Sequence, residues 1–128
     1  MPSYLLRVRS GFEAAHHLLS YRGGVEPNHG HSFRVEAALT AAELDGEGMA
    51  HDFVAVKDAL DGLARELDHR DLNQLAQFRG VSPTTERIAE WFWRALVERL
   101  PGAAVAEVTV WEGPDCSATF RSDAEACA

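Results

Sequence analysis

Hydrophobic and polar residues alternate along the first part of the chain, and this two-residue period predicts a strand over residues 3–15. A second alternating run, from His31 to about Leu44, predicts another strand that places Phe33, Val35 and Ala37 on one face. The residues between them, 20–28, contain two glycines and a proline, which favours a loop. The opening third of the protein is therefore expected to form two strands joined by a loop.

The middle of the chain changes to a period of three to four residues, which predicts two amphipathic helices. Asp52 is the expected N-cap of the first, which ends near His69, and its apolar stripe consists of Phe53, Val56, Leu60, Leu63 and Leu67. Ser82 is the expected cap of the second, with Pro83 at its first helical position. Its buried stripe is expected to be Ile88, Trp91, Phe92, Ala95 and Leu96.

Strand-like residues return at 105–112 and 118–121, around a turn of glycine, proline and aspartate, and predict a closing hairpin. The element order is then ββααββ. It favours an α+β fold, an antiparallel sheet with two helices on one face. We expect one domain over residues 1–121 and a C-terminal tail over residues 122–128.

Composition narrows the possible partners and surroundings. The net charge of -8 and the single lysine, Lys57, argue against a nucleic-acid partner. No apolar segment reaches the length of a membrane span, and the N-terminus lacks the apolar region of a signal peptide. Cys116 and Cys127 give neither a disulfide framework nor a zinc-knuckle spacing, so a cytoplasmic location is expected.

Three histidines form the most informative pattern in the chain. His29 and His31 lie two residues apart, so on a strand their imidazoles project from the same face. His16 ends another alternating stretch, and pairing of the two strands would bring all three side chains together. Three imidazoles with an open fourth position suit a catalytic zinc ion, although nickel or iron would also bind imidazoles. The simpler interpretation is that these are unrelated polar side chains.

Several separated motifs occur in this order: Phe12-Glu13-Ala14-Ala15-His16, His29-Gly30-His31, Asp52-Phe53, Leu67-Asp68-His69, Pro83-Thr84-Thr85-Glu86 and Glu112. They resemble those of the 6-pyruvoyl-tetrahydropterin synthase and 6-carboxytetrahydropterin synthase family. The resemblance implies the tunnelling fold, in which sheets of several subunits join into a barrel. It also implies Zn²⁺ on the three histidines, a pterin triphosphate substrate, and a homo-hexamer, a dimer of trimers, with active sites between subunits.

One position departs from the common form of the family, which has a catalytic cysteine four residues before the first histidine of the His-Gly-His motif. Here that residue is Val25, and Glu26 follows it. A subgroup that this arrangement resembles has the glutamate in place of the cysteine and cleaves the side chain of 7,8-dihydroneopterin triphosphate to 6-hydroxymethyl-7,8-dihydropterin, a folate precursor. Glu26 would then be the general base. The alternative for Glu26 is a solvated loop carboxylate.

The resemblance also assigns the remaining site residues. His69 would be the partner acid or base and Asp68 would orient it, although a histidine at a helix end can simply complement the helix dipole. Glu112 would anchor the pterin, assisted by Thr84, Thr85 and Glu86. Three further functions stay open: 6-carboxytetrahydropterin synthesis for queuosine and deazapurines, 6-pyruvoyl-tetrahydropterin synthesis, and a non-catalytic module that binds zinc and pterin.

Overall fold

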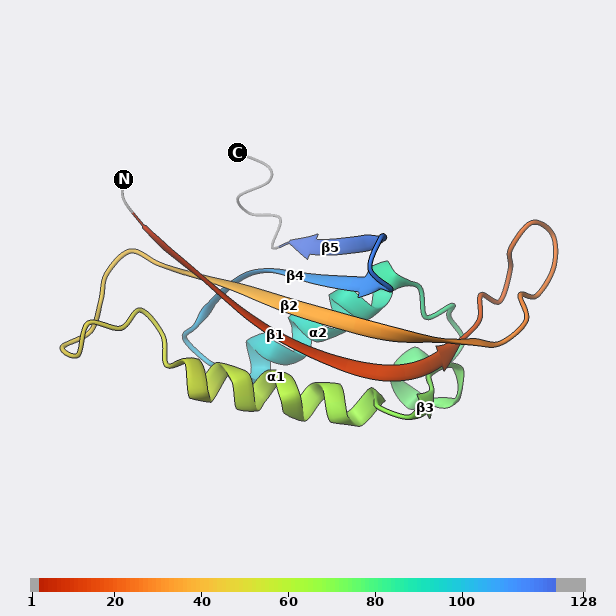
Figure 1. The fold of residues 1–128 in the computed structure, drawn as a ribbon, viewed down its shortest axis with the longest axis horizontal. Coiled ribbons are helices and arrows are strands. Elements are labelled where there is room, and N and C mark those ends of the chain that lie inside the picture. The colour runs from red at the N-terminus through yellow and green to blue at the C-terminus, as the bar shows by residue number, and fades with distance from the viewer. Residues whose placement is uncertain (1–2, 122–128) are drawn as a thin grey trace.

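A computed structural model describes residues 3–121 and shows one twisted, five-stranded sheet with the order β3-β1-β2-β4-β5. Figure 1 shows both helices on one side of this sheet, where α1 packs against β1 and α2 against β4 and β5. This confirms the predicted α+β architecture. The elements are β1 (Tyr4–His16), β2 (His29–Ala41), α1 (Phe53–Leu67), β3 (Arg70–Asp71), two short 3-10 turns (Leu72–Gln74 and Ala76–Phe78), α2 (Thr85–Arg99), β4 (Ala104–Glu112) and β5 (Ser117–Arg121).

The two long strands pair antiparallel over their whole length, from Tyr4 opposite Ala41 to His16 opposite His29. Because opposed residues share a face, every second residue of each strand faces the helices. Phe33, Val35 and Ala37 are fully buried on that face, as predicted. The strand β2 begins at His29 and ends at Ala41, so it starts earlier and ends earlier than the sequence indicated.

The first helix begins as predicted, because the side chain of Asp52 accepts a hydrogen bond from the backbone N–H of Val54 at 2.9 Å. Its buried residues are Val56, Leu60, Leu63, Ala64 and Leu67. The prediction that Phe53 belongs to this stripe is wrong, since its side chain is 56% exposed. Phe53 and the more exposed Val54, at 67%, begin the first turn and lie outside the core, although the spacing of Phe53 fits the period.

The start of the second helix also differs from the prediction. Thr84 is the N-cap and accepts a hydrogen bond from Arg87 N–H at 3.2 Å, so the helix begins at Thr85. The Ser82 hydroxyl instead accepts a hydrogen bond from the backbone N–H of Leu19 at 2.7 Å. Ser82 and Pro83 therefore precede the helix, and the Pro83 carbonyl takes no part in its backbone hydrogen bonds.

One strand was not predicted. β3 has only two residues and pairs in parallel with Ala14 and Ala15 of β1, so the sheet is mixed rather than purely antiparallel. Two residues are too short for a period to show in the sequence. Within residues 3–121 no helix has the length and apolarity to cross a membrane. The expected tail, residues 122–128, lies outside the described residues.

Candidate metal centre and active site

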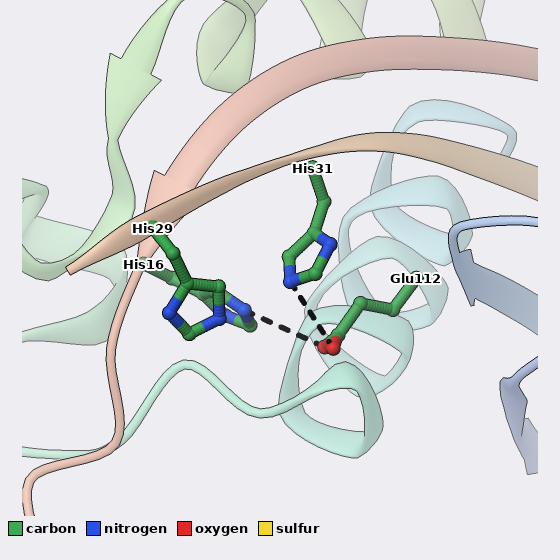
Figure 2. Close-up of side chains that lie close together, drawn as sticks. All are labelled: His16, His29, His31 and Glu112. Carbon is green, nitrogen blue, oxygen red and sulfur yellow. Dashed lines mark ion pairs between the residues drawn. The ribbon is translucent and has the colours of Figure 1, made fainter. Parts of the chain in front are cut away.

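Strand register brings the three predicted histidines together at one end of the sheet. His16 lies directly opposite His29, and His31 lies opposite Ala14, so all three imidazoles project toward the helix-covered face. The ring centroids are 4.8–5.2 Å apart in each pairing. Figure 2 shows the three rings around a common point, with the Glu112 carboxylate on its open side. One ligand atom from each of these four residues lies within 4.8 Å of the others.

Backbone carbonyl groups fix the tautomers of two of these histidines. His16 Nδ1 lies 2.8 Å from the Pro83 carbonyl oxygen, and His29 Nδ1 lies 2.9 Å from the Pro27 carbonyl oxygen. A carbonyl oxygen only accepts hydrogen bonds, so each Nδ1 carries the proton and donates it. In the neutral imidazoles the Nε2 atoms then hold lone pairs. This arrangement, with Nδ1–H on a carbonyl and Nε2 free, is typical of metal-binding histidines.

Two ring nitrogen atoms without hydrogen-bond partners fit a metal ion held at this point. His16 Nε2 and His31 Nε2 are buried and form no hydrogen bond with any described residue. Burial lowers the pKa of His31 below 6.5; Glu112 opposes this effect, while His16 and His29 add to it. A neutral His31 is the form that binds a metal. A set of imidazole and carboxylate donors without thiolate fits zinc.

Glu112 is the last residue of β4 and continues the helix-facing row of Val108 and Val110. Its Oε1 lies 3.2 Å from His31 Nε2 and its Oε2 lies 3.4 Å from His16 Nε2. The Thr85 hydroxyl donates a hydrogen bond to Oε2 at 3.0 Å. The sequence resemblance gave Glu112 only a substrate contact, so its position against the histidines is a finding of the structure.

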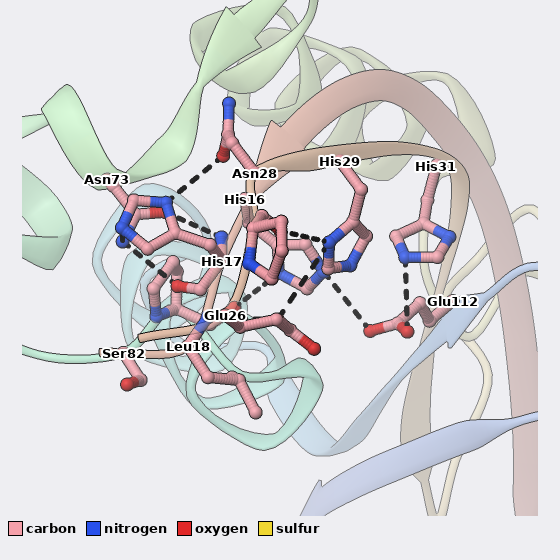
Figure 3. A network of polar contacts seen from close by, with 12 residues as sticks. His16, His17, Leu18, Glu26, Asn28, His29, His31, Asn73, Ser82 and Glu112 are labelled. Carbon is pink, nitrogen blue, oxygen red and sulfur yellow. Dashed lines mark hydrogen bonds and ion pairs between the residues drawn. The ribbon is translucent and has the colours of Figure 1, made fainter. Parts of the chain in front are cut away.

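Glu26 lies at the end of the loop that leads into β2, and Figure 3 shows it beside His29. Its Oε1 accepts a hydrogen bond from Leu18 N–H at 3.0 Å, and its own backbone N–H donates to the Leu18 carbonyl at 3.1 Å. The same Oε1 lies 3.8 Å from His29 Nδ1, and Oε2 forms no hydrogen bond within the described part of the chain. The side chain is 24% exposed, so it is held in place rather than free in solvent.

Most of the predicted site residues line one hollow of ≈ 240 Å³. It is bounded by His16, Leu18, Glu26, His29, Thr84, Thr85, Glu86 and Glu112. His16, His29, the candidate base and the expected pterin contacts therefore open onto the same space, whereas His31 is not among the lining residues. No lysine or arginine of the described chain is among the lining residues.

Asp68 and His69 do not line that hollow. His69 is 80% exposed and borders another hollow of ≈ 570 Å³, whose lining also includes Glu13, Ser32 and His31 of the histidine cluster. Asp68 Oδ1 accepts a hydrogen bond from Glu13 N–H at 2.8 Å, and its Oδ2 lies 3.0 Å from His69 Nδ1. These two contacts, the Glu13 amide first, lower the pKa of Asp68 below 3.8. Asp68 and His69 therefore contact each other, but they do not share a hollow with Glu26.

Two polar side chains that sequence reasoning left out of the site support the Glu26 loop. Asn73 accepts a hydrogen bond from His17 N–H at 2.9 Å and donates one to the His17 carbonyl at 3.0 Å. The ring of His17 contacts Asn28 at 3.1 Å and lies outside the cluster of His16, His29, His31 and Glu112. No sequence signal pointed to Asn73, because its partner lies far away in the chain.

The fold and the site together define an α+β protein with three histidines and a glutamate that could hold a metal ion at the end of its sheet. The sequence model of the 6-pyruvoyl tetrahydropterin synthase family matches residues 5–123, nearly the whole chain. The protein belongs to this family.

Its similarity extends to relatives with different names. A dihydroneopterin monophosphate aldolase of Pyrococcus furiosus is 36% identical over 106 residues, covering 82% of this chain and 86% of that protein. A 6-carboxy-5,6,7,8-tetrahydropterin synthase of Aquifex aeolicus is 29% identical over 120 residues, 74% of each chain.

Solved structures agree on the fold. The 6-pyruvoyl tetrahydropterin synthase of Caenorhabditis elegans superimposes with a TM-score of 0.83 at 22% identity, covering 95% of this chain and 97% of that one. A Plasmodium vivax 6-pyruvoyltetrahydropterin synthase, in a variant that replaces a catalytic glutamate by alanine, has a TM-score of 0.80 at 22% identity and covers 95% and 99% of the two chains.

Proposed function

We propose that this protein is a zinc-dependent lyase that cleaves the side chain of a phosphorylated 7,8-dihydroneopterin and releases 6-hydroxymethyl-7,8-dihydropterin. The observation that carries this proposal is the hollow that Glu26 shares with His16, His29 and Glu112. A carboxylate held beside three metal-binding imidazoles can take a proton from a substrate hydroxyl. Zinc on His16, His29 and His31 would act as a Lewis acid that polarises the oxygen atoms of the side chain.

The reaction is a retro-aldol cleavage and needs no oxidant. Glu26 removes the proton of the hydroxyl on the second side-chain carbon, and the bond between the first and second carbons breaks. The electron pair moves to the first carbon and into the adjoining ring C=N bond. A proton then binds the first carbon and gives the hydroxymethyl group. The second and third carbons leave as glycolaldehyde with the phosphate attached.

The protein supplies positions for each of these steps. The hydrogen bond from Leu18 N–H holds Oε1 of Glu26, which leaves Oε2 to take the proton. Thr84, Thr85, Glu86 and Glu112 line the same hollow and would receive the pterin ring, whose N–H donors suit a carboxylate. His69, oriented by Asp68, would give the proton to the first carbon.

The name of one relative supports this reaction class, and the name of another supports a glutamate as a catalytic residue. The Pyrococcus furiosus relative is named an aldolase, and a catalytic glutamate is named for the Plasmodium vivax protein. The first name also favours a monophosphate over the triphosphate that the sequence resemblance implied.

The direct test is to incubate zinc-loaded protein with 7,8-dihydroneopterin monophosphate and, separately, with the triphosphate, and to identify products by mass. We expect 6-hydroxymethyl-7,8-dihydropterin and a phosphorylated glycolaldehyde. Glu26→Ala should lower the rate by about 10²–10⁴-fold with unchanged zinc content. Glu43→Ala, on an exposed loop, is the matched control. A 6-carboxy or 6-pyruvoyl product would refute the lyase assignment, and pterin binding without turnover would indicate a binding module.

The separation of His69 from Glu26 is the reason to propose that active sites form between subunits, in an assembly that we expect to be hexameric. Glu26→Ala and His69→Ala should each be inactive alone. Co-expressed, they should regain activity at about a quarter of the sites, since random mixing pairs an intact Glu26 with an intact neighbouring His69 at that frequency. No recovery in mixed assemblies would refute a shared site.

A further inference from the structure

We infer that Glu112 is a fourth protein ligand of the metal centre when no substrate is bound. The inference depends on the metal centre and not on the reaction proposed above. It also goes beyond the three histidines that the sequence motif supplies, and it gives Glu112 a contact that the sequence resemblance did not imply.

The distances between Glu112 and the histidines fit a cation bound to both. The carboxylate lies 3.2 Å from His31 Nε2 and 3.4 Å from His16 Nε2. Since Nδ1 of His16 donates to the Pro83 carbonyl, Nε2 of the neutral ring carries a lone pair that points toward a negative oxygen. Two electron-rich atoms this close repel each other in a mostly buried site. A metal ion bound to both removes the repulsion.

A hydrogen bond from Thr85 holds the Glu112 carboxylate in its orientation toward the histidines. The Thr85 hydroxyl donates to Oε2 at 3.0 Å, and Thr85 is fixed as the first residue of α2. Hydrogen-bonded carboxylates of this kind are typical metal ligands, and their partners contribute to metal affinity. Glu112 is 31% exposed, so the carboxylate is also accessible from the hollow.

A bound Glu112 would occupy the coordination position that the substrate needs. With Glu112 bound, all four ligands come from the protein, as in a closed site. A substrate oxygen must then displace the carboxylate or enlarge the coordination to five. Glu112, once displaced, is free to accept the N–H donors of a pterin.

Metal affinity measured without any pterin tests this inference. Zinc affinity would be determined by competition with a chromogenic chelator for the wild type, Glu112→Gln and Thr85→Val. The control is Glu107→Gln, on the same strand, where the carboxylate pairs with Arg121 instead. We expect a loss of at least about tenfold for Glu112→Gln, a smaller loss for Thr85→Val, and a change within about twofold for Glu107→Gln.

Cobalt-substituted protein gives a second readout that is independent of activity. The visible absorption of the wild type should be that of a four-coordinate site with three nitrogen ligands and one carboxylate, and Glu112→Gln should change both its intensity and its position. Circular dichroism of the metal-free variants establishes that they are folded. An unchanged zinc affinity and an unchanged cobalt spectrum in Glu112→Gln would overturn the inference, and so would failure of the wild type to bind either metal. Thr85→Val stays informative if Glu112→Gln does not fold.

Discussion

Phe33 links the hydrophobic core to the metal centre, and replacing it by leucine tests whether core packing sets metal affinity. The ring is fully buried, and its centroid lies 4.9 Å from that of Phe12 in a stacked arrangement. It also contacts His16 and His31 edge to face, at 5.4 and 5.6 Å. Phe33 is therefore the surface against which two of the metal-binding rings pack.

The structure gives the size of the expected effects. Phe33→Leu removes one stacked aromatic pair, worth about 0.5–1.5 kcal/mol, and leaves a small cavity that costs roughly 1 kcal/mol. The free energy of unfolding of the metal-free protein should fall by about 1.5–2.5 kcal/mol. The two imidazoles lose a supporting contact, so zinc affinity should fall about tenfold, which corresponds to about 1.4 kcal/mol.

Phe12→Leu is the matched control. The Phe12 ring stacks on Phe33 and contacts Phe92, and its aromatic contacts within residues 3–121 include no histidine. Urea unfolding at one protein concentration should show a similar loss of stability for both variants, and chelator competition should show weaker zinc binding only for Phe33→Leu. An equal change in zinc affinity for both, or for neither, would refute this reasoning.

Further predictions concern stability. The pKa of Asp68 is lowered in the folded protein, so its hydrogen bond from Glu13 stabilises the fold above pH 3.8. This contribution to the free energy of unfolding is lost as the pH falls through the lower folded pKa. A carbon-13 titration of the carboxyl group measures this pKa, and a midpoint at or above 3.8 would contradict the prediction. Leu60→Ala should cost about 2–5 kcal/mol in urea unfolding, whereas Phe53→Ala should change stability by less than about 0.5 kcal/mol. Thr84→Ala should cost about 0.5–2 kcal/mol, and a neutral result would remove Thr84 as the helix cap.

The convergence of His16, His29 and His31 could be predicted because it follows from the strand period alone. Residues two apart share a face, and the pairing of the first two strands in a single hairpin leaves few possible registers. The buried face of β2 and the Asp52 cap were predicted for the same reason, since each depends on residues close together in the chain.

The place of Glu112 could not be predicted in this way. It depends on the register between β2 and β4, where Glu112 lies opposite Phe33, and on the side-chain conformation that the Thr85 hydroxyl holds. The sequence also could not predict that the candidate residues line two different hollows. The motifs identify Asp68 and His69, but no local pattern says that the folded chain places them away from Glu26.

The helix start is where an error of two residues changes the chemistry. If Pro83 were the first helical residue, its carbonyl would accept the helical hydrogen bond from Arg87 N–H. In the structure the Thr84 hydroxyl accepts from Arg87 N–H instead, and the Pro83 carbonyl is left to accept from His16 Nδ1. That contact places the lone pair of His16 on Nε2, toward the metal position. The next residue, Thr85, holds Glu112. The cap that begins α2 therefore also orients two of the four groups at the metal centre, and for this reason helix and site depend on the same three residues.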